Sequence, residues 1–364
     1  MVMRIGQVFP AEYESQLTSK KALLQDLFAP YALPEIEIYR SEPEHYRQRA
    51  EFRIWHDGDD IYHAMFDSDT KQKVRIDYFP VASKLIADFM PVLLSKIQFN
   101  HALRYKLYQV DYLATLSGEL LISMIYKRQL DEQWQQAAND LTNELLPEWN
   151  VKIIGRSRKQ KVVLKDDFVT ERFAVGKKTL AYQQVEGSFT QPNAGVNQQM
   201  LNWAAKIAGQ LNGDLLELYC GNANFSLALA DYFEQVVATE ISRTSIKSAQ
   251  YNIALNGIDN VQVLQMSAED VSKALANGSA LKHIDLASMT LNTVLVDPPR
   301  AGLDPDTLQL VSRFNDIIYI SCNPQTLADN LQILDKTHRV VCSALFDQFP
   351  YSHHVETGLW LQKR

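Results

Sequence analysis

LLELYCGNANFSLALA, residues 215–230, decides the fold of the second half of this chain. The apolar run Leu215–Leu218 is typical of a buried strand, and a loop that contains Gly221 leads from it into a helical pattern. Further strand-like runs (VVATE, VQVLQ, TVLVDPP and IIYIS) alternate with helical patterns up to the C-terminal part. This alternation predicts a doubly wound parallel α/β sheet with right-handed crossovers, in which ligands bind at the carboxyl ends of the strands.

The first half has a different pattern of short β-rich runs, FRIWH, IYHAMF, YKLYQVDYL and LLISMIY, with the hairpin signal HDGDD at 56–60. Residues 131–146 read as a helix with Asp131 at its start, and 151–165 as two strands joined by a basic turn. An amphipathic helix opens the chain over 11–31, with Tyr13, Leu17 and Leu24 on one face. We therefore expect three parts: 1–40, an α+β domain over 41–180, and the α/β domain over 181–364.

Composition limits the class of protein. The chain has 364 residues, of which 46% are hydrophobic and 10% aromatic, which excludes a disordered or collagen-like protein. No apolar run approaches the roughly 18–20 residues that cross a bilayer, and the first residues lack the pattern of a secretory signal. We expect a cytoplasmic protein with no membrane contact. Three cysteines without a CxxC pair argue against disulfides, an iron–sulfur cluster and a zinc site.

The net charge of −7 disfavours a nucleic-acid partner when the chain is taken as a whole, but the two halves of the chain differ in charge. Residues 1–180 hold 25 Lys and Arg against 25 Asp and Glu, so the entire deficit lies in the second half. Residues 151–178 carry nine basic side chains against three acidic ones. This basic segment is either a solvated hairpin or an edge that contacts phosphates, and the sequence leaves both interpretations open.

The loop after Leu218 stands where a dinucleotide-binding protein carries GxGxxG, yet it has a single glycine, so a pyrophosphate cradle is poorly supported. Glu240 ends the next strand about 20 residues on, where an acid accepts hydrogen bonds from ribose hydroxyls. The combination favours S-adenosylmethionine, with other nucleotides as alternatives. Asp297 ends a later strand in DPPR and faces the same crevice, unless it is a surface acid on a rigid loop.

Cys322 follows the strand IIYIS and precedes Asn323 and Pro324, a favoured N-cap and a favoured first helical residue. A helix N-terminus stabilises negative charge, so the position predicts a thiolate nucleophile. The alternative is a small buried apolar residue, and we assign Cys342 to that class.

Glu356 precedes the last strand, GLWLQ, and desolvation there would raise its pKa into the range of a general base. An ordinary exposed acid is the competing interpretation. His353 and His354 beside it lack a third ligand, so we expect no metal site.

Four motifs together resemble the RNA uracil-5-methyltransferases: ELYCGNANF (217–225), DPPR (297–300), SCNP (321–324) and HVET (354–357). The stretches HYRQRAEFRIWHDGDD (45–60), QVEGSFTQPN (184–193) and FDQFPYSHH (346–354) look like the bacterial tRNA branch of that family. The resemblance is collinear and covers nearly the whole chain. It implies a Rossmann-like methyltransferase domain at 181–364, an RNA-binding domain at 41–180, and an opening helix that packs on the catalytic domain.

The resemblance also implies a mechanism. Cys322 would add to C6 of uracil, so that C5 becomes nucleophilic and attacks the methyl group of S-adenosylmethionine, and Glu356 would then remove the C5 proton. Arg300 would orient the uracil or a phosphate. The cofactor site would be formed by Gln191, Tyr219, Gly221, Asn224, Glu240 and Asp297.

By the same resemblance the substrate is uridine 54 in the T-loop of tRNA, with tmRNA as a further substrate, and the base must leave its stack to reach the nucleophile. Candidates for RNA contact are Arg47, Arg49, Arg53 and Tyr108, with Tyr108 as a stacking platform; each could instead be a core residue or part of an ion pair. Ribosomal relatives commonly carry an iron–sulfur cluster and an additional N-terminal domain, for which this chain has neither the cysteines nor the length. We expect a monomer.

Several other functions stay open at this point. Ribosomal RNA is the nearest alternative substrate. DPPR also resembles the acidic Pro-Pro motifs of exocyclic-amine N-methyltransferases, which need no cysteine. A non-catalytic protein that binds or folds tRNA is a third class. Cytosine-C5 methylation is less compatible, because its usual Pro-Cys motif is missing.

Overall fold

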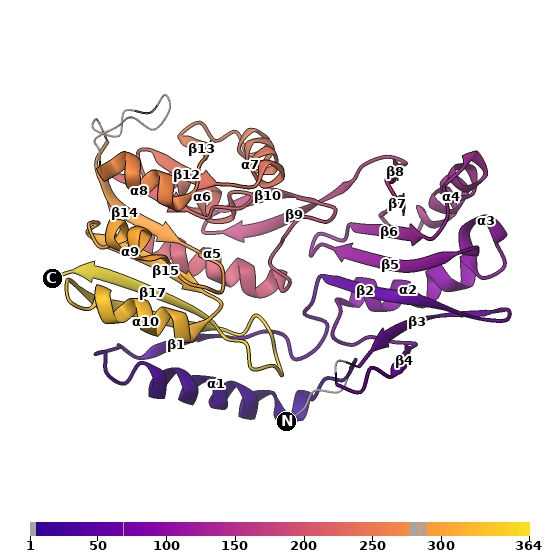
Figure 1. Ribbon diagram of the computed structural model, residues 1–364, viewed down its shortest axis with the longest axis horizontal. Helices are drawn as coiled ribbons and strands as arrows, with labels where there is room; N and C mark the ends of the chain where they lie inside the picture. The colour runs from indigo at the N-terminus through magenta and orange to yellow at the C-terminus, as the bar shows by residue number, and fades with distance from the viewer. Residues whose placement is uncertain (1–4, 68, 277–283, 285–288) are drawn as a thin grey trace. The chain divides into compact units, whose positions relative to one another are not determined.

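The strand expected at Leu215–Leu218 forms because its side chains are covered on both faces of a sheet. In the computed structural model, all five residues of β11 (Asp214–Leu218) are buried, and β11 lies between β14 (Leu291–Val296) and β12 (Val236–Glu240). The structure describes residues 5–67, 69–276, 284 and 289–364 (Figure 1). A strand that is buried on both faces of a sheet has a nearly continuous run of apolar residues in its sequence, and β11 follows this pattern.

The chain divides into two compact units. The first unit contains the residues up to Ala11, Glu42–Arg172 and Gln183–Gly195, and the second contains Glu12–Ser41, Phe173–Tyr182 and Val196–Arg364. β9 (Phe168–Val175) and β10 (Lys178–Val185) form a two-stranded sheet of their own, and each has residues in both units.

The second unit is built on an eight-stranded sheet in the order β1-β16-β17-β15-β14-β11-β12-β13. β11 to β15 are mutually parallel, whereas β17 runs antiparallel to both β15 and β16, so the sheet is mixed rather than wholly parallel. Its remaining strands are β1 (Ile36–Tyr39), β13 (Val261–Gln265), β15 (Asp316–Ser321), β16 (His338–Phe346) and β17 (Glu356–Lys363).

Helices of the second unit follow the strands in alternation, as the sequence predicts. They are α5 (Ala194–Ala208), α6 (Asn224–Leu229), a 3-10 turn η2 (Ala230–Tyr232), α7 (Arg243–Leu255), α8 (Ala268–Ala276), α9 (Pro305–Val311) and α10 (Pro324–Leu334). Ser242 caps α7, and Asp304 caps α9 by accepting a hydrogen bond from the Thr307 N–H at 3.0 Å.

The opening helix, α1 (Tyr13–Leu27), follows a 3-10 turn η1 (Pro10–Glu12) and lies in the second unit (Figure 1). Leu17 and Leu24 of α1 join one hydrophobic cluster with side chains of β11, β14, β15, α9 and α10. The apolar face predicted from the sequence is therefore buried. Lys20 lies on that buried face as well, 5% exposed, where the sequence pattern leads one to expect an apolar side chain.

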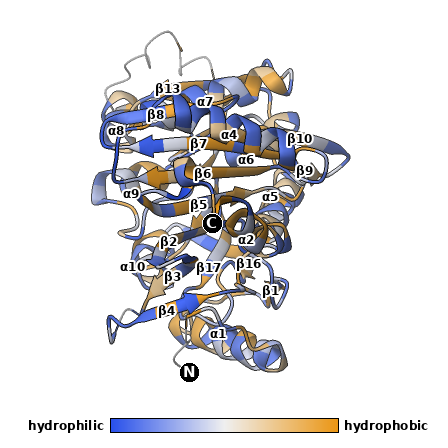
Figure 2. Cartoon of the chain, turned by 90° about the vertical axis from the view of Figure 1, so that its right-hand side faces the viewer, coloured by the Kyte–Doolittle hydropathy of each residue, from blue (hydrophilic) through white to orange (hydrophobic). Residues whose placement is uncertain are grey.

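The first unit is a seven-stranded sheet in the order β4-β3-β2-β5-β6-β7-β8, accompanied by three helices. β6 and β7 are parallel and are connected through α4, whereas the other pairs are antiparallel. The elements are β2 (Arg49–Asp57), β3 (Asp60–Phe66), β4 (Lys73–Ile76), α2 (Lys84–Ile97), α3 (His101–Arg104), β5 (Leu107–Ala114), β6 (Leu120–Tyr126), α4 (Glu132–Leu145), β7 (Val151–Ser157) and β8 (Gln160–Val163). The central strands β5 and β6 carry largely hydrophobic colouring in Figure 2.

Local sequence signals of the first unit are confirmed. Gly58 turns the β2–β3 hairpin with a φ of 58°, and the Asp131 carboxylate accepts a hydrogen bond from the Trp134 N–H at 2.9 Å to cap α4. Gly155 lets α4 approach β7 closely, because a Cβ at that position would lie 2.3 Å from the Trp134 ring. The sequence analysis did not predict β1, β4, β9, β10 or β16. None of the helices in the described ranges is long and apolar enough to span a membrane.

Candidate active site

The predicted nucleophile and base lie at adjoining strand ends of the second unit. β15 pairs with β17 so that Ser321 faces Thr357, which places Cys322 and Glu356 next to each other just beyond that pair. β14 pairs with β15 so that Val296 faces Tyr319, and Asp297 therefore follows at the same edge. Parallel strands end at one edge of a sheet, so three side chains far apart in the chain meet there.

Cys322 precedes a well-capped helix. The Asn323 side chain accepts a hydrogen bond from the Gln325 N–H at 3.2 Å, and Pro324 is the first residue of α10, as the sequence predicts. The Asn323 Nδ2 also donates to the Arg300 carbonyl at 2.9 Å, and Thr326 Oγ1 donates to the same carbonyl at 3.3 Å. These contacts fix the DPPR loop against the helix that follows the nucleophile.

The charge state of Cys322 differs from the sequence expectation. The pKa of the Cys322 thiol is raised to about 11: burial is the largest cause, the neighbouring carboxyls of Glu356 and Asp297 also raise it, and Arg300 lowers it. This shift favours the thiol, in contrast to the thiolate that the helix N-terminus leads us to expect. Desolvation and the neighbouring acids oppose the helix dipole, whose influence falls off within one turn.

Glu356 is 3% exposed at the start of β17, so it is not the surface acid that the sequence left open. Burial raises the pKa of the Glu356 carboxyl well above its usual value, and the neighbouring Asp297 raises it further. Burial also raises the pKa of Asp297 to about 7. The expected desolvation of Glu356 is confirmed, and two neighbouring acids compete here for a single negative charge.

Gly358 lies two residues beyond Glu356 in β17, where the strand passes under aromatic rings. A Cβ at this position would lie 2.8 Å from the Trp203 ring and 2.9 Å from the Phe346 ring. Only a glycine fits without a shift of these rings, and both belong to the packing that holds the start of β17 in place.

The loop after β11 is held in an unusual backbone conformation. Tyr219, Gly221 and Ala223 all have positive φ, at 64°, 56° and 66°. Glu240 at the end of β12 fixes the loop, because its Oε2 accepts a hydrogen bond from the Gly221 N–H at 3.1 Å. Its Oε1 accepts from the N–H groups of Ile241 at 2.9 Å and Ser242 at 2.8 Å. The carboxylate is thus oriented at the strand end, and the space over Gly221 is open.

Asn224 begins α6, but its side chain pairs with a partner that sequence reasoning missed. Asn224 Nδ2 donates to Asn197 Oδ1 at 2.9 Å, and Asn197 Nδ2 donates to Asn224 Oδ1 at 3.1 Å. Asn197 lies in α5 and is 4% exposed. The sequence signal that could have identified Asn197 is its position as a polar residue on the apolar face of α5.

Glu217 is a second residue that the sequence analysis missed. It is 1% exposed in β11, and burial raises the pKa of its carboxyl to about 8. The Ser226 hydroxyl of α6 donates a hydrogen bond to Glu217 Oε2, which ties the helix to the strand beneath the loop. The sequence signal that could have identified Glu217 is a lone acid within the apolar run LLEL.

Gln191, the remaining predicted cofactor residue, belongs to the first unit, in the segment Gln183–Gly195, and its role stays a prediction.

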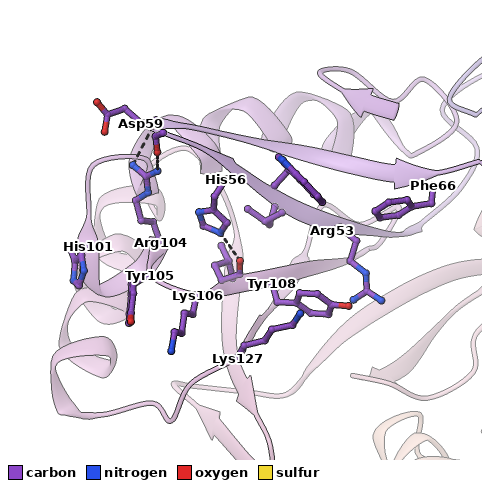
Figure 3. Close-up of a pocket in the computed structure, with 14 residues that line it drawn as sticks. Arg53, His56, Asp59, Phe66, His101, Arg104, Tyr105, Lys106, Tyr108 and Lys127 are labelled. Atoms are coloured by element: carbon purple, nitrogen blue, oxygen red, sulfur yellow. Dashed lines mark hydrogen bonds between the residues drawn. The ribbon is translucent and has the colours of Figure 1, made fainter. Parts of the chain in front are cut away.

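The four predicted RNA contacts of the first unit have different surroundings. The Arg53 guanidinium lies 4.1 Å from the centre of the Tyr108 ring, and both residues line one groove (Figure 3). Arg49 forms an ion pair with Glu51 at 3.1 Å and donates to the Ser188 carbonyl at 3.2 Å. Arg47 Nε donates to the Arg49 carbonyl at 2.9 Å. The structure therefore brings Arg53 and Tyr108 together, whereas the Arg47 and Arg49 side chains have partners elsewhere.

Four of the nine basic side chains in the segment 151–178 form ion pairs. Lys152 lies 3.0 Å from Glu119 and 3.4 Å from Asp166, and Lys161 lies 2.6 Å from Asp167. Further pairs are Arg156 with Glu186 and Lys178 with Asp231 at 2.5 Å. These contacts favour the interpretation as a structural hairpin over a phosphate-contacting edge.

Known proteins resemble the chain over its full length. The family model described as tRNA (Uracil-5-)-methyltransferase matches residues 12–364. The tRNA/tmRNA (uracil-C(5))-methyltransferase of Colwellia psychrerythraea is 55% identical over 99% of this chain and 100% of that protein. The Shewanella baltica protein of the same name is 53% identical over 100% of both chains. The structure of a Pyrococcus abyssi tRNA (uracil-54, C5)-methyltransferase in complex with S-adenosyl-L-homocysteine shares the fold, with a TM-score of 0.71 and 22% identity over 96% of this chain and 83% of that one.

Proposed function

Since this chain belongs to the tRNA (uracil-5-)-methyltransferase family, we propose that it methylates C5 of the T-loop uridine of tRNA, and of tmRNA as well. The chain is an S-adenosylmethionine-dependent tRNA uracil-C5 methyltransferase, and uridine 54 is the finer assignment that we propose, by analogy with the name of the Pyrococcus abyssi enzyme. The observation that supports the chemistry best is the meeting of Cys322 and Glu356 at adjoining ends of β15 and β17. A thiol and a buried carboxyl at neighbouring positions are what addition to C6 and proton removal from C5 require.

In the proposed mechanism the Cys322 sulfur adds to C6 of the uracil. The sulfur electron pair forms the S–C6 bond, and the C5=C6 π electrons move to C5 and O4, so that C5 becomes nucleophilic. S-adenosylmethionine supplies an electrophilic methyl group when it is bound. After C5 has been methylated, Glu356 accepts the C5 proton, the C5=C6 bond forms again, and the thiolate leaves.

The electrostatics of the site suit both steps. The half-buried thiol of Cys322 must release its proton to solvent before the attack, and the Arg300 guanidinium favours the thiolate by lowering the pKa of Cys322. Glu356 has a raised pKa, which makes it a stronger base than an exposed carboxylate once it is ionised. We assign Arg300 to the substrate for the same reason, because its charge also stabilises the enolate.

The loop residues Tyr219, Gly221 and Asn224, together with Glu240 and Asp297, are the proposed cofactor site, and Gln191 is the sixth member. The loop fits a nucleoside without a pyrophosphate. Three backbone N–H groups hold the Glu240 carboxylate, which leaves its outer lone pairs for ribose hydroxyls, and the space over Gly221 accommodates an adenosyl group. We further propose that residues 41–180 bind RNA, that 181–364 carry out catalysis, and that the protein acts as a monomer.

The test of the function uses the purified protein, S-adenosylmethionine with an isotopically labelled methyl group, and an unmodified tRNA transcript. We expect one methyl group on C5 of the T-loop uridine, located by nuclease digestion and mass spectrometry. A transcript with cytidine at that position is the control and should stay unlabelled. Incubation with total RNA reports whether tmRNA or ribosomal RNA is also modified. A methyl group on an exocyclic amine, or no transfer, would contradict the proposal.

A second prediction concerns the ionisation of Cys322. In a Cys220→Ala/Cys342→Ala background, alkylation by iodoacetamide should accelerate about tenfold per pH unit from pH 7 to pH 10 without levelling off, because the pKa of the remaining thiol is about 11. Glu356→Gln should lower that pKa, since it removes a negative charge beside the sulfur. Glu234→Gln, at an exposed position of the same unit, is the matched control and should change nothing. A plateau below pH 8 in the parent would show that the thiolate is already stable.

A further inference from the structure

The first unit contains a groove between β2, β5 and the end of α3, with a volume of about 960 Å³ (Figure 3). We call it the α3 groove. Its lining contains four Lys or Arg side chains and two His side chains against one acid, Asp59. This balance is unlike that of the whole chain, with its net charge of −7. A concave surface with this charge favours a polyanion.

One wall of the α3 groove is an aromatic ring between two cations. The Tyr108 ring has the Arg53 guanidinium 4.1 Å and the Lys127 ammonium 3.8 Å from its centre. Tyr108 was already a candidate stacking platform from the sequence. Both cations lie over the ring, so a base can stack on Tyr108 only where the flexible Lys127 side chain moves aside, and its ammonium is then free to contact a flanking phosphate.

A second aromatic platform lies toward α3, and neither the sequence motifs nor the proposed mechanism involves it. The Tyr105 ring is 46% exposed and stacks on the His101 ring, with centroids 5.0 Å apart and an interplanar angle of 16°. The Lys106 ammonium lies 5.3 Å from the centre of the Tyr105 ring. Figure 3 shows His101 and Tyr105 side by side, with Lys106 pointing into the same groove as Lys127. A cation and an exposed ring therefore occur together twice in one groove.

Arg104 has a structural role in the same wall. Its guanidinium donates to the carbonyls of Gly58 at 2.6 Å, Asp59 at 3.2 Å and Gln98 at 3.0 Å. These contacts fix the end of α3 against the β2–β3 hairpin. The Tyr105 platform is thus anchored on a rigid corner, so that stacking on it does not require the backbone to become ordered.

We propose that the α3 groove binds an unpaired segment of the substrate RNA, with one base stacked on the Tyr105–His101 pair and another on Tyr108 in the place that the Lys127 ammonium now occupies, and with Lys106 and the displaced Lys127 on the intervening phosphates. The two tyrosines are three positions apart in the chain, so their Cα atoms are separated by at most about 11 Å, within the reach of a short RNA segment. The inference rests on the proposed function and adds a second base-binding position to it.

The test compares Tyr105→Ala with Tyr105→Phe, using fluorescence anisotropy of labelled tRNA and steady-state methylation of the same tRNA. Loss of one base–aromatic stack should weaken binding and raise KM by about five- to 150-fold, with kcat little changed. Tyr105→Phe keeps the ring and should restore binding. Phe99→Ala removes an 80% exposed ring near α3 that does not line the groove, and it should bind like the parent.

Lys106→Gln provides an independent readout through salt. The logarithm of the binding constant should fall less steeply with the logarithm of the salt concentration, by about 0.7 for one lost phosphate contact to a single strand. Lys165→Gln, at an exposed position outside the groove, is the matched control. If the parent methylates tRNA while Tyr105→Ala and Lys106→Gln leave KM, affinity and salt slope unchanged, the groove does not bind RNA and the proposed function still stands. If the parent fails to methylate tRNA, the proposed function itself is wrong.

Discussion

Cys322→Ala is expected to abolish methylation of tRNA while the protein remains folded. Without the sulfur there is no addition to C6, and C5 of uracil is too weak a nucleophile to take the methyl group unaided. Removal of a covalent nucleophile in other enzymes lowers the rate by about 10⁴-fold or more, and we expect a loss of that order. The measurement is methyl transfer to a tRNA transcript under single-turnover conditions.

Cys342→Ala is the matched control for this prediction. Cys342 is also a half-buried free cysteine of the second unit, but it lies in β16 with its Sγ 3.2 Å from Glu37 Oε1, away from the strand ends that carry Cys322 and Glu356. Its removal should leave methylation nearly unchanged. A tRNA with 5-fluorouridine should form a lasting covalent adduct with the parent and with Cys342→Ala, because fluorine at C5 cannot be removed as a proton. An adduct with Cys322→Ala would overturn the assignment.

Lys20→Met should destabilise the protein strongly, because it separates a buried ion pair. The Lys20 ammonium lies 2.6 Å from Asp347 Oδ1, and the two side chains are 6% and 0% exposed. Lys20 Nζ also donates to the Phe349 carbonyl at 2.8 Å, and Gln16 Nε2 donates to Asp347 Oδ2 at 2.8 Å. Removal of one partner leaves a buried carboxylate without its counter-charge, which costs about 3–5 kcal/mol of unfolding free energy.

Urea denaturation followed by circular dichroism would measure this loss. Lys21→Met is the control, because Lys21 is the next residue of α1, is half-buried rather than buried, and is in none of the ion pairs found among the described residues. In Lys20→Met/Asp347→Asn the unpaired charge is gone, so this variant should lose less stability than the sum of the two single variants. Equal stability of Lys20→Met and Lys21→Met would show that the buried pair contributes nothing.

The Lys20–Asp347 ion pair should also affect catalysis, because it anchors the segment that leads to Glu356. Asp347 follows the end of β16, and the segment that begins there leads to Glu356 at the start of β17. α1 thereby holds a segment that connects to the proposed base. Lys20 and Asp347 are positioning residues in this view, and Lys20→Met should lower kcat as well as stability.

Features of the site that depend on neighbouring residues alone were predictable from the sequence. Asn323 and Pro324 cap and begin α10 as predicted, because capping uses side chains within three residues of the helix end. The parallel strands from β11 to β15 follow from apolar runs between helical patterns. The antiparallel direction of β17 and its pairing with β16 were harder to predict from the sequence. The direction of a strand depends on where its connection crosses the sheet rather than on its composition.

Features that depend on distant residues were not predictable in this way. The Asn197–Asn224 pair and the Lys20–Asp347 pair join residues 27 and 327 positions apart, and no local pattern identifies such partners. The charge on residues 151–178 suggested a phosphate-contacting edge, but acidic side chains from other elements neutralise part of it. Net charge within a segment therefore does not predict the potential at its surface.

The sequence by itself determined the two kinds of sheet, the family and the identity of the reactive residues, because motifs and periodicity are properties of consecutive positions. Only the tertiary structure decided how those residues ionise. Folding buries Cys322 next to Glu356 and Asp297, which lie 34 residues after it and 25 residues before it in the chain, and this raises the pKa of its thiol to about 11. Desolvation and the field of charges brought together by the fold control ionisation, and both arise only when the strand ends meet.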